Sequence, residues 1–210
     1  MEKIYIGIVL GFVLLASSCT KNSFISTGNS QGRFDGTMLE YMEAHSYDWD
    51  STVVMIHHAG EEMVALFDGR DENHPEITFW GFTNHSIRRY LLENDIEQVS
   101  DLDPEWCKSI LLQHVVDKKY FRTDLPKGIL GEYDTQGIGG ITLKTLAGTD
   151  VWAYTVVKES GGITENAARP IYMIFKKSGR HFGIASGDLE QDNGVVHALE
   201  YWFTIGQEEK

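Results

Sequence analysis

The chain has 210 residues, of which 42% are hydrophobic, enough for one domain of ordinary size plus a short extension. Its formal net charge is −13, and no cluster of Lys or Arg offsets that charge locally. An acidic surface repels phosphate backbones and anionic lipid headgroups, so nucleic acid is excluded as an expected partner.

The first residues predict a cleaved secretory signal. Lys3 precedes an uncharged apolar run over residues 4–15, which is too short to span a bilayer but suits a signal peptide. The run ends in LASSC and resembles the bacterial lipobox, in which the Cys becomes the lipid-modified first residue. The resemblance implies a signal peptide at 1–18, lipidation of Cys19, and an outer-membrane-anchored lipoprotein of the bacterial cell envelope. Whether it faces outward or into the periplasm stays open, and an ordinary secretory signal is the alternative.

Residues 19–33 are polar and rich in Gly, Ser and Asn, which predicts a flexible tether. We expect a folded domain over residues 34–206 and a polar tail at 207–210. Cys107 is the other cysteine. If Cys19 carries a lipid, Cys107 has no partner within the chain, and its apolar neighbours predict a buried helical thiol.

Helix signals dominate the first half of this domain. Apolar residues recur at spacings of three and four after residues that suit a helix N-cap. The expected helices begin at Asp35, at Asp50 or Ser51, at Glu61, at Thr83 or Asn84, and at Asp103 followed by Pro104. Between them, Ile77–Phe82 is apolar on both faces, so it predicts a strand in the interior of a sheet.

From Val115 the pattern changes to short β-branched and aromatic runs separated by Gly. The expected strands are 115–121, 141–146, 151–157, 171–176, 181–185 and 195–203. Asn193-Gly194 is a strong turn signal before the last strand, which should share one core with Ile77–Phe82. A helical first half and an antiparallel second half predict an α+β fold.

Three segments resemble the fasciclin (FAS1) domain family. They are ITFWGFTNHS at 77–86, an apolar strand running into Thr-Asn, ILLQHVVDKKY at 110–120, with its characteristic His, and NGVVHALEYWF at 193–203. The resemblance implies a wedge-shaped β-sheet core flanked by several helices, and a non-enzymatic role in adhesion or binding. It assigns structural roles to Phe79, Phe82, Thr83, Asn84, His114, Asn193, Gly194 and His197.

Asp188-Leu189 resembles an Asp-Ile pair that some family members present for cell-surface contacts, and a surface turn is the alternative interpretation. His114 and His197 stand in apolar strings. We expect each to join two elements through hydrogen bonds, because an unpaired buried imidazole costs about 1 to 3 kcal/mol.

Other groups give no defensible catalytic or metal site. His57 and His58 are adjacent and point about 100° apart on a helix, so they cannot chelate one ion from that turn. The acidic loop of residues 68–73 lacks the ligand spacing of an EF-hand. Gly137, Gly139 and Gly140 precede a strand, which favours a hairpin turn over a phosphate loop. We therefore expect no cofactor, no metal and no enzymatic activity.

The sequence predicts an envelope lipoprotein that binds a protein or glycan partner. A structural accessory subunit of an envelope polysaccharide-capture complex is the alternative, and it predicts an exposed apolar patch. An enzyme would instead need a pocket where a His and a carboxylate converge. Exposed aromatic rings would favour glycan binding, and the candidates are Trp152, Tyr154, Tyr172 and Trp202.

Overall fold

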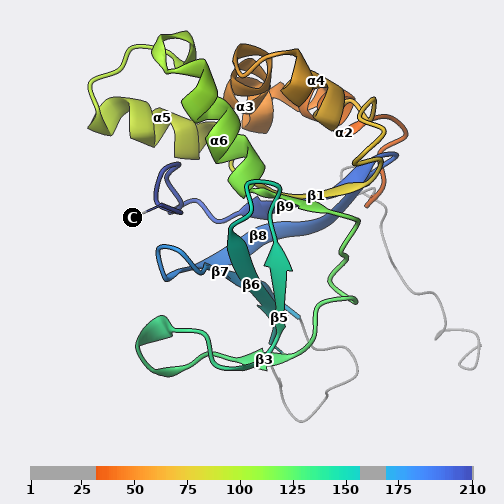
Figure 1. Cartoon of the computed structure of the whole chain (residues 1–210), viewed down its shortest axis with the longest axis vertical. Helices are drawn as coiled ribbons and strands as arrows, with labels where there is room; N and C mark the ends of the chain where they lie inside the picture. Colours follow the sequence, from red (N-terminus) through yellow and green to blue (C-terminus); the bar gives the residue numbers. More distant parts are fainter. Residues whose placement is uncertain (1–31, 157–168, 210) are drawn as a thin grey trace, which may run out of the picture. The chain divides into compact units, whose positions relative to one another are not determined.

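The computed structural model describes residues 32–156 and 169–209. The expected signal peptide, Cys19 and most of the tether lie outside these residues. In the described part, helices fill most of the first half and strands most of the second (Figure 1). The α+β prediction is confirmed.

Five helices lie in the described residues, and α3 packs against the other four. Their bounds are α2 (Met38–Ala44), α3 (Ser46–His58), α4 (Glu61–Phe67), α5 (Asn84–Glu93) and α6 (Pro104–Gln113). Short 3₁₀ turns lie at Val99–Asp101 (η1) and Glu132–Asp134 (η2).

Two helix starts differ from the prediction. Thr37, not Asp35, caps α2, because its hydroxyl accepts from the Glu40 N–H while the Glu40 carboxylate accepts from the Thr37 N–H. Helix α3 begins before Asp50, because it follows α2 directly and His45 serves as the junction of both. The predicted start of α6 is confirmed, since the Asp103 side chain accepts from the Trp106 N–H at 2.8 Å.

The main sheet has seven strands in the order β2-β1-β9-β8-β7-β6-β5. Their bounds are β1 (Ile77–Gly81), β2 (Val115–Asp117), β5 (Ile141–Lys144), β6 (Asp150–Thr155), β7 (Ile171–Phe175), β8 (Arg180–Gln191) and β9 (Gly194–Leu199). Neighbours are antiparallel except β1 and β9, which are parallel. A bridge between Val116 and Thr145 brings the two edge strands together.

The predicted pairing of the two apolar strands is confirmed. Ile77 lies opposite Gly194 and Gly81 opposite Ala198, and every residue of both strands is buried. The predicted turn before β9 is present at Asp192 and Asn193, although neither Asn193 nor Gly194 has positive φ. Gly194 is needed for space instead, since a Cβ there would overlap Met38 and lie 2.6 Å from the Ile77 carbonyl oxygen.

Three strand lengths were predicted wrongly. β2 stops at Asp117, where Lys118 turns to a φ of 87°. β8 continues to Gln191, because bulges between Ile184 and Leu189 absorb a Gly- and Asp-containing stretch typical of a loop. β9 ends at Leu199, so Trp202 lies beyond the strand and is 73% exposed.

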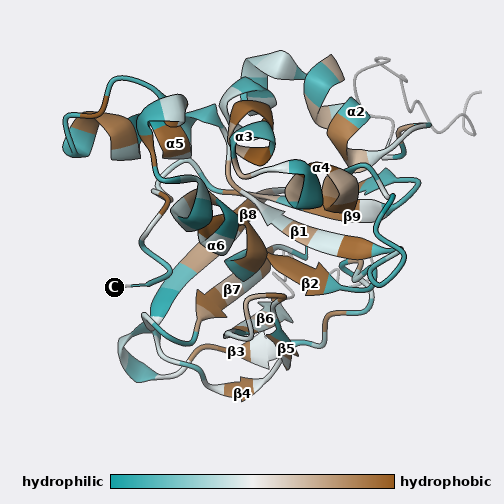
Figure 2. Cartoon of the chain, turned by 45° about the horizontal axis from the view of Figure 1, so that its top comes forward, coloured by the Kyte–Doolittle hydropathy of each residue, from teal (hydrophilic) through white to brown (hydrophobic). Residues whose placement is uncertain are grey.

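One large apolar cluster joins the helices to the sheet, and Figure 2 shows apolar residues on β1 and on the helices beside it. A small separate cluster of Trp152, Tyr154 and Ile174 lies further along the sheet. There β3 (Gly128–Ile129) and β4 (Ile138–Gly139) form a two-stranded ribbon. The Trp152 indole N–H donates to the Gly139 carbonyl at 3.0 Å.

The glycines near residue 140 do not form the expected hairpin turn. Gly139 belongs to β4, and Gly140, with a φ of +61°, turns the chain into β5 against the Trp152 ring.

Among the described residues, no helix is long and apolar enough to cross a membrane.

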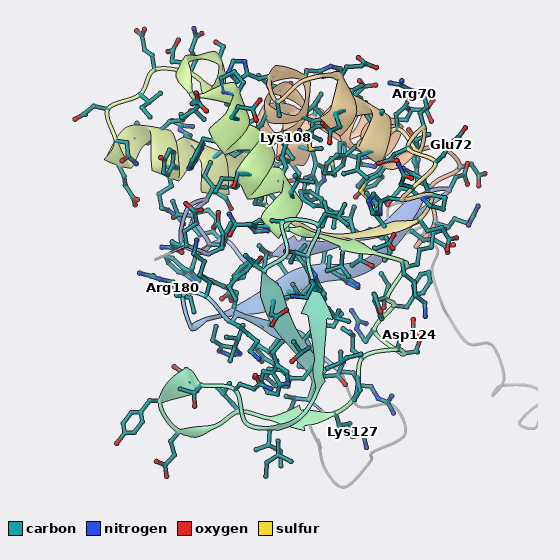
Figure 3. All side chains as sticks on the ribbon, viewed as in Figure 1. Arg70, Glu72, Lys108, Asp124, Lys127 and Arg180 are labelled. Atoms are coloured by element: carbon teal, nitrogen blue, oxygen red, sulfur yellow. The ribbon has the colours of Figure 1, made fainter. Side chains whose placement is uncertain are left out.

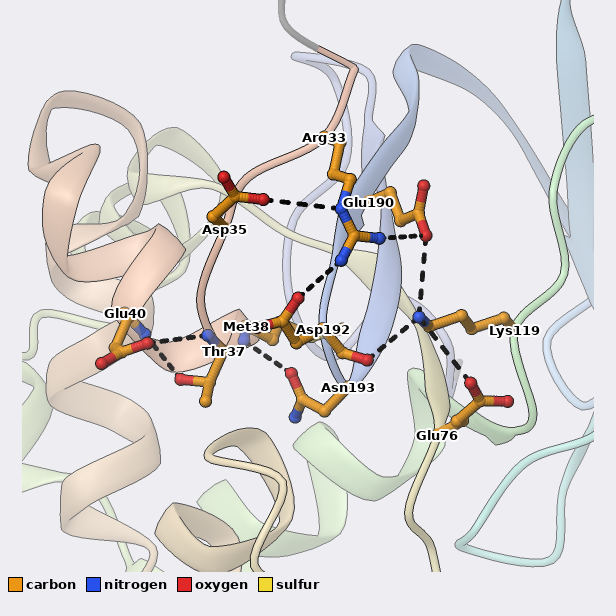
Figure 4. Close-up of polar contacts among 10 residues, drawn as sticks. All are labelled: Arg33, Asp35, Thr37, Met38, Glu40, Glu76, Lys119, Glu190, Asp192 and Asn193. Carbon is orange, nitrogen blue, oxygen red and sulfur yellow. Dashed lines mark hydrogen bonds and ion pairs between the residues drawn. The ribbon is translucent and has the colours of Figure 1, made fainter.

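The chain just before α2 is attached to the sheet. The backbone N–H of Phe34 donates to the Glu190 carbonyl at 2.8 Å, and Arg33 forms ion pairs with Glu190 and Asp192 (Figure 4). Lys119 extends this network by donating to the Asp192 carbonyl. Gly32 and Arg33, expected within the tether, are thus held by β8 and the β8–β9 turn.

Candidate functional site

Two asparagines of the family-like motifs join helices to the sheet. Asn193 accepts from the Met38 N–H at 2.7 Å and donates to the Phe67 carbonyl at 2.9 Å, so it joins the β8–β9 turn to α2 and α4. Asn84 accepts from the Ser51 N–H and donates to the Ser46 and Tyr47 carbonyls, which fixes α5 against α3. Both side chains therefore have architectural contacts. Thr83 is the N-cap residue of α5 but makes no capping hydrogen bond through its side chain.

His197 of β9 lies beside Asp188 of β8. The His197 Nε2 donates to the Tyr120 carbonyl at 2.7 Å, and its Nδ1 accepts from the Asp188 N–H at 3.3 Å. Burial is the main cause that lowers the pKa of His197. The hydrogen bond to the Tyr120 carbonyl and the charge of Asp188 raise this pKa, whereas Arg122 lowers it further. The imidazole also stacks on Trp80 at 5.0 Å.

Asp188 lies within β8 and not in the surface turn expected from the sequence. Its carboxylate accepts from the Arg122 N–H at 2.7 Å and lies 3.7 Å from the Arg122 guanidinium. Its φ of 59° is rare for a residue with a side chain, and the bulge in β8 supplies it. Leu189 pairs with Val196 and also lines a pocket.

His114 is fully buried, as is Glu208 beside it. The His114 Nδ1 donates to the Trp80 carbonyl at 2.7 Å, and its Nε2 lies 3.8 Å from a Glu208 oxygen. Phe79 and Phe82 pack their rings against this imidazole. The expected polar tail at 207–210 is therefore wrong at Glu208, because the carboxylate also accepts from the Gly206 N–H at 3.0 Å.

A half-open pocket of about 270 Å³ lies where α2, α3, the start of α5, the bulged middle of β8 and the end of β9 meet. Its apolar floor includes Ala198, Leu199 and Leu189. The bulged part of β8 opens this space, since β8 departs from regular pairing with β9 between Ile184 and Leu189. The pocket thus results from a sheet irregularity that faces helices.

Aromatic rings and one carboxylate form the rest of the lining. Tyr41, Trp49 and Tyr201 contribute rings, and Asp48 contributes an exposed carboxylate. Burial raises the pKa of the Tyr41 phenol, and the Asp48 charge raises it further, whereas a hydrogen bond with Trp49 opposes both. The Asp48 carboxylate is thus close enough to Tyr41 to act on its phenol.

Ser186 and His85 also line this pocket. In the described part of the chain, no hydrogen bond joins Ser186 to His85 or His85 to Asp48. The His85 ring instead lies 4.9 Å from the Tyr201 ring. A nucleophile activated by a neighbouring base requires such contacts, and the described residues do not show them at this pocket.

The remaining candidate residues take ordinary structural contacts. The His58 Nε2 donates to the Leu102 carbonyl, and Asp68 is paired with Arg70. Burial raises the pKa of the Cys107 thiol to about 11, so little reactive thiolate is present near neutral pH. Among residues 32–156 and 169–209, no group of three or more His, Cys, Asp or Glu could hold a metal ion.

The aromatic residues considered for sugar stacking differ strongly in solvent exposure. Trp152 and Tyr154 are 1% and 2% exposed, whereas Trp202 is 73% exposed and Tyr201 is 54% exposed. Sequence reasoning named Trp202 but missed Asp48, His85 and Tyr201 as a group. These residues come from three distant segments, and a sequence without contact information offers no signal that a β8 bulge brings them together.

No protein family and no curated protein matches the chain in sequence comparisons. Among solved structures, it is similar to a FAS1 domain pair from the insect cell adhesion molecule fasciclin I. The TM-score is 0.41 and the identity 13%, over 80% of this chain and 46% of the other chain. This chain thus spans less than half of that structure's length.

Proposed function

We propose that this chain is a non-enzymatic lipoprotein of the bacterial cell envelope, with a FAS1-like domain that acts in adhesion or binding of a protein or glycan partner. The observation that carries the binding role is the half-open pocket of about 270 Å³ with aromatic walls and an unpaired carboxylate. Surface pockets that combine apolar walls with few polar groups are the usual sites of recognition.

The motif residues support the FAS1-like part of the proposal. The first and last motifs supply the parallel neighbours β1 and β9, and the central motif supplies His114 beneath β1. All three segments therefore meet in one core, which the sequence resemblance requires.

The lipobox-like residues support the envelope part. Mass spectrometry of the N-terminal peptide should find Cys19 as the first residue with a diacylglyceryl thioether, and Cys19→Ala should release the protein from membranes. An unmodified Cys19 would remove the lipoprotein assignment. Protease treatment of intact cells then distinguishes the two membrane faces, since digestion without lysis requires an outward-facing domain.

The binding role is tested with arrays of glycans and matrix proteins. We expect the wild-type chain to capture a ligand, Tyr201→Ala to lose it, and Trp202→Ala to keep it, because Tyr201 lines the pocket and Trp202 does not. Both side chains are largely exposed, so neither substitution should unfold the domain. Equal capture by the two variants would place the binding site elsewhere.

A structural accessory role in an envelope polysaccharide-capture complex is the second candidate. The observation that favours it is the β3–β4 ribbon, where Ile129, Tyr133 and Ile138 are 70%, 94% and 78% exposed. Grouped apolar side chains of this kind mark association surfaces more often than isolated ones do.

A further inference from the structure

We propose that the pocket lined by Asp48, Tyr41 and Tyr201 receives the cationic side chain, Lys or Arg, of a protein partner. This inference rests on the proposed binding role and specifies the chemistry of the partner.

The first support is an uncompensated carboxylate. Asp48 lines the pocket and is exposed, and no ion pair or hydrogen bond of its side chain occurs within the described residues. Other acidic groups nearby differ, since Asp50 lies outside the lining and Glu43 has His57 at 3.8 Å. Asp48 is thus a negative charge beside a cavity, and no cation in the described part of the chain is paired with it.

The second support is the aromatic wall. The rings of Tyr41 and Tyr201 line the cavity, and the electron-rich faces of such rings attract ammonium and guanidinium groups within about 6 Å. Tyr201 already shows this behaviour on the protein itself, because the Arg89 guanidinium lies 5.0 Å from its ring centre. Arg89 is held by the Tyr201 and Phe203 carbonyls and does not line the pocket.

The third support is charge complementarity over longer distance. The chain carries a formal charge of −13, which accelerates encounters with basic partners and slows those with acidic ones. Within the pocket, burial is the main cause that raises the pKa of the half-buried Tyr41 phenol, the hydrogen bond with Trp49 opposes it, and the Asp48 charge adds a smaller increase. A buried alkyl stem and an ammonium head match an apolar floor and a carboxylate rim.

A sugar fits these observations less well. Pyranose rings stack on open aromatic faces, and indoles provide the largest ones. The exposed indole of Trp202 does not line the pocket, and Trp49, which does, is 2% exposed. No indole face lies open inside this cavity.

The test titrates the full chain, in a non-ionic detergent, with Nα-acetyl-lysine methylamide and with its neutral norleucine analogue. We expect NMR shifts of the Trp49 indole and of amides at Thr83–His85 with the lysine compound alone. Raising the salt concentration should weaken them, since ion pairs at exposed sites are screened. Asp48→Asn should weaken binding by about threefold to tenfold.

Glu72→Gln is the matched control, because Glu72 is an exposed carboxylate without a partner in the described residues and lies outside the lining, near the end of α4 (Figure 3). Equal shifts with the lysine and norleucine compounds, or unchanged binding by Asp48→Asn, would overturn the inference. Shifts at the same amides with a methyl pyranoside instead would favour a glycan and overturn it as well. Array capture that still depends on Tyr201 would then leave the proposed binding role standing.

Discussion

His197 shows how the family-like motif places a titratable group where its neutral form is favoured. Its ring is buried, donates from Nε2 to the Tyr120 carbonyl, and accepts at Nδ1 from the Asp188 N–H. Protonation would add a hydrogen at Nδ1, facing that same N–H. Arg122, paired with Asp188, adds positive charge nearby. The site therefore favours the neutral imidazole.

This environment predicts a pH dependence of stability. The folded pKa of His197 lies below the unfolded value of about 6.5, with burial as the main cause. Below about pH 6.5 the unfolded chain binds a proton that the native protein does not, so the free energy of unfolding falls as the pH falls. The slope reaches up to about 1.4 kcal/mol per pH unit. Urea unfolding between pH 7.5 and 5.5 measures it.

His197→Gln should flatten this slope, because the Gln amide can donate to the Tyr120 carbonyl without titrating. His181 contributes in the same direction, since burial lowers its pKa as well, so part of the slope should remain. His57→Gln is the control, because the His57 side chain is 52% exposed. A slope that stays the same in His197→Gln would contradict the assignment.

At the scale of elements, the helices are fixed to the sheet by a few side chains that bond to backbone groups. Asn193 is 7% exposed, and its one amide serves both the first N–H of α2 and the last carbonyl of α4. A helix end needs such partners, because its terminal N–H and C=O groups have none within the helix. The β8–β9 turn thereby positions α2, which supplies Tyr41 to the pocket.

Asn193→Ala should lower the free energy of unfolding by about 2 to 4 kcal/mol, because it leaves the Met38 N–H and the Phe67 carbonyl buried without partners. Chemical denaturation followed by circular dichroism measures the loss. The matched substitution Asn73→Ala, at an exposed Asn whose side chain makes no hydrogen bond in the described residues, should change stability by less than about 0.5 kcal/mol. Equal effects would show that Asn193 does not join these elements.

The sequence predicted those elements whose signals are local. Asp103-Pro104 marks the start of α6, and the two apolar strands beside Thr83 and after Asn193 do pair in one core. The start of α6 is signalled by capping chemistry, and the two strands are signalled by runs of adjacent hydrophobic residues. The turn at Asn193 was predicted too, but the need for Gly194 was not, because that need arises from the closeness of Met38 and Ile77 in the folded chain.

Elements controlled by distant contacts escaped prediction. β8 passes through Ser186 to Asp188 as a bulged strand because β9 and Arg122 satisfy its backbone and its carboxylate. Glu208 is buried because His114 and the Gly206 N–H lie beside it. The pocket combines Asp48 with Tyr201, which lie 153 positions apart in the sequence. These two residues become neighbours only when the sheet has formed.

At the scale of the whole domain, the pocket and the β3–β4 ribbon expose different kinds of side chain. The pocket combines rings with a carboxylate, whereas the β3–β4 ribbon presents aliphatic residues, with Ile129 directly opposite Ile138. Lys127 lies beside this ribbon, while Arg70 and Lys108 lie with the helices (Figure 3). Paired aliphatic side chains on a short ribbon retain unfavourable contact with water that a partner would relieve.

The double substitution Ile129→Ser with Ile138→Ser tests the ribbon as an assembly surface. Because both side chains are largely exposed, the free energy of unfolding should change by less than about 1 kcal/mol. Proteins retained with the tagged chain from detergent-solubilised envelopes, identified by quantitative mass spectrometry, should nevertheless be lost. The control pair Val54→Ser with Leu92→Ser removes exposed apolar groups from α3 and α5 and should retain them. Retention of the same proteins by both pairs would contradict the ribbon as an assembly surface.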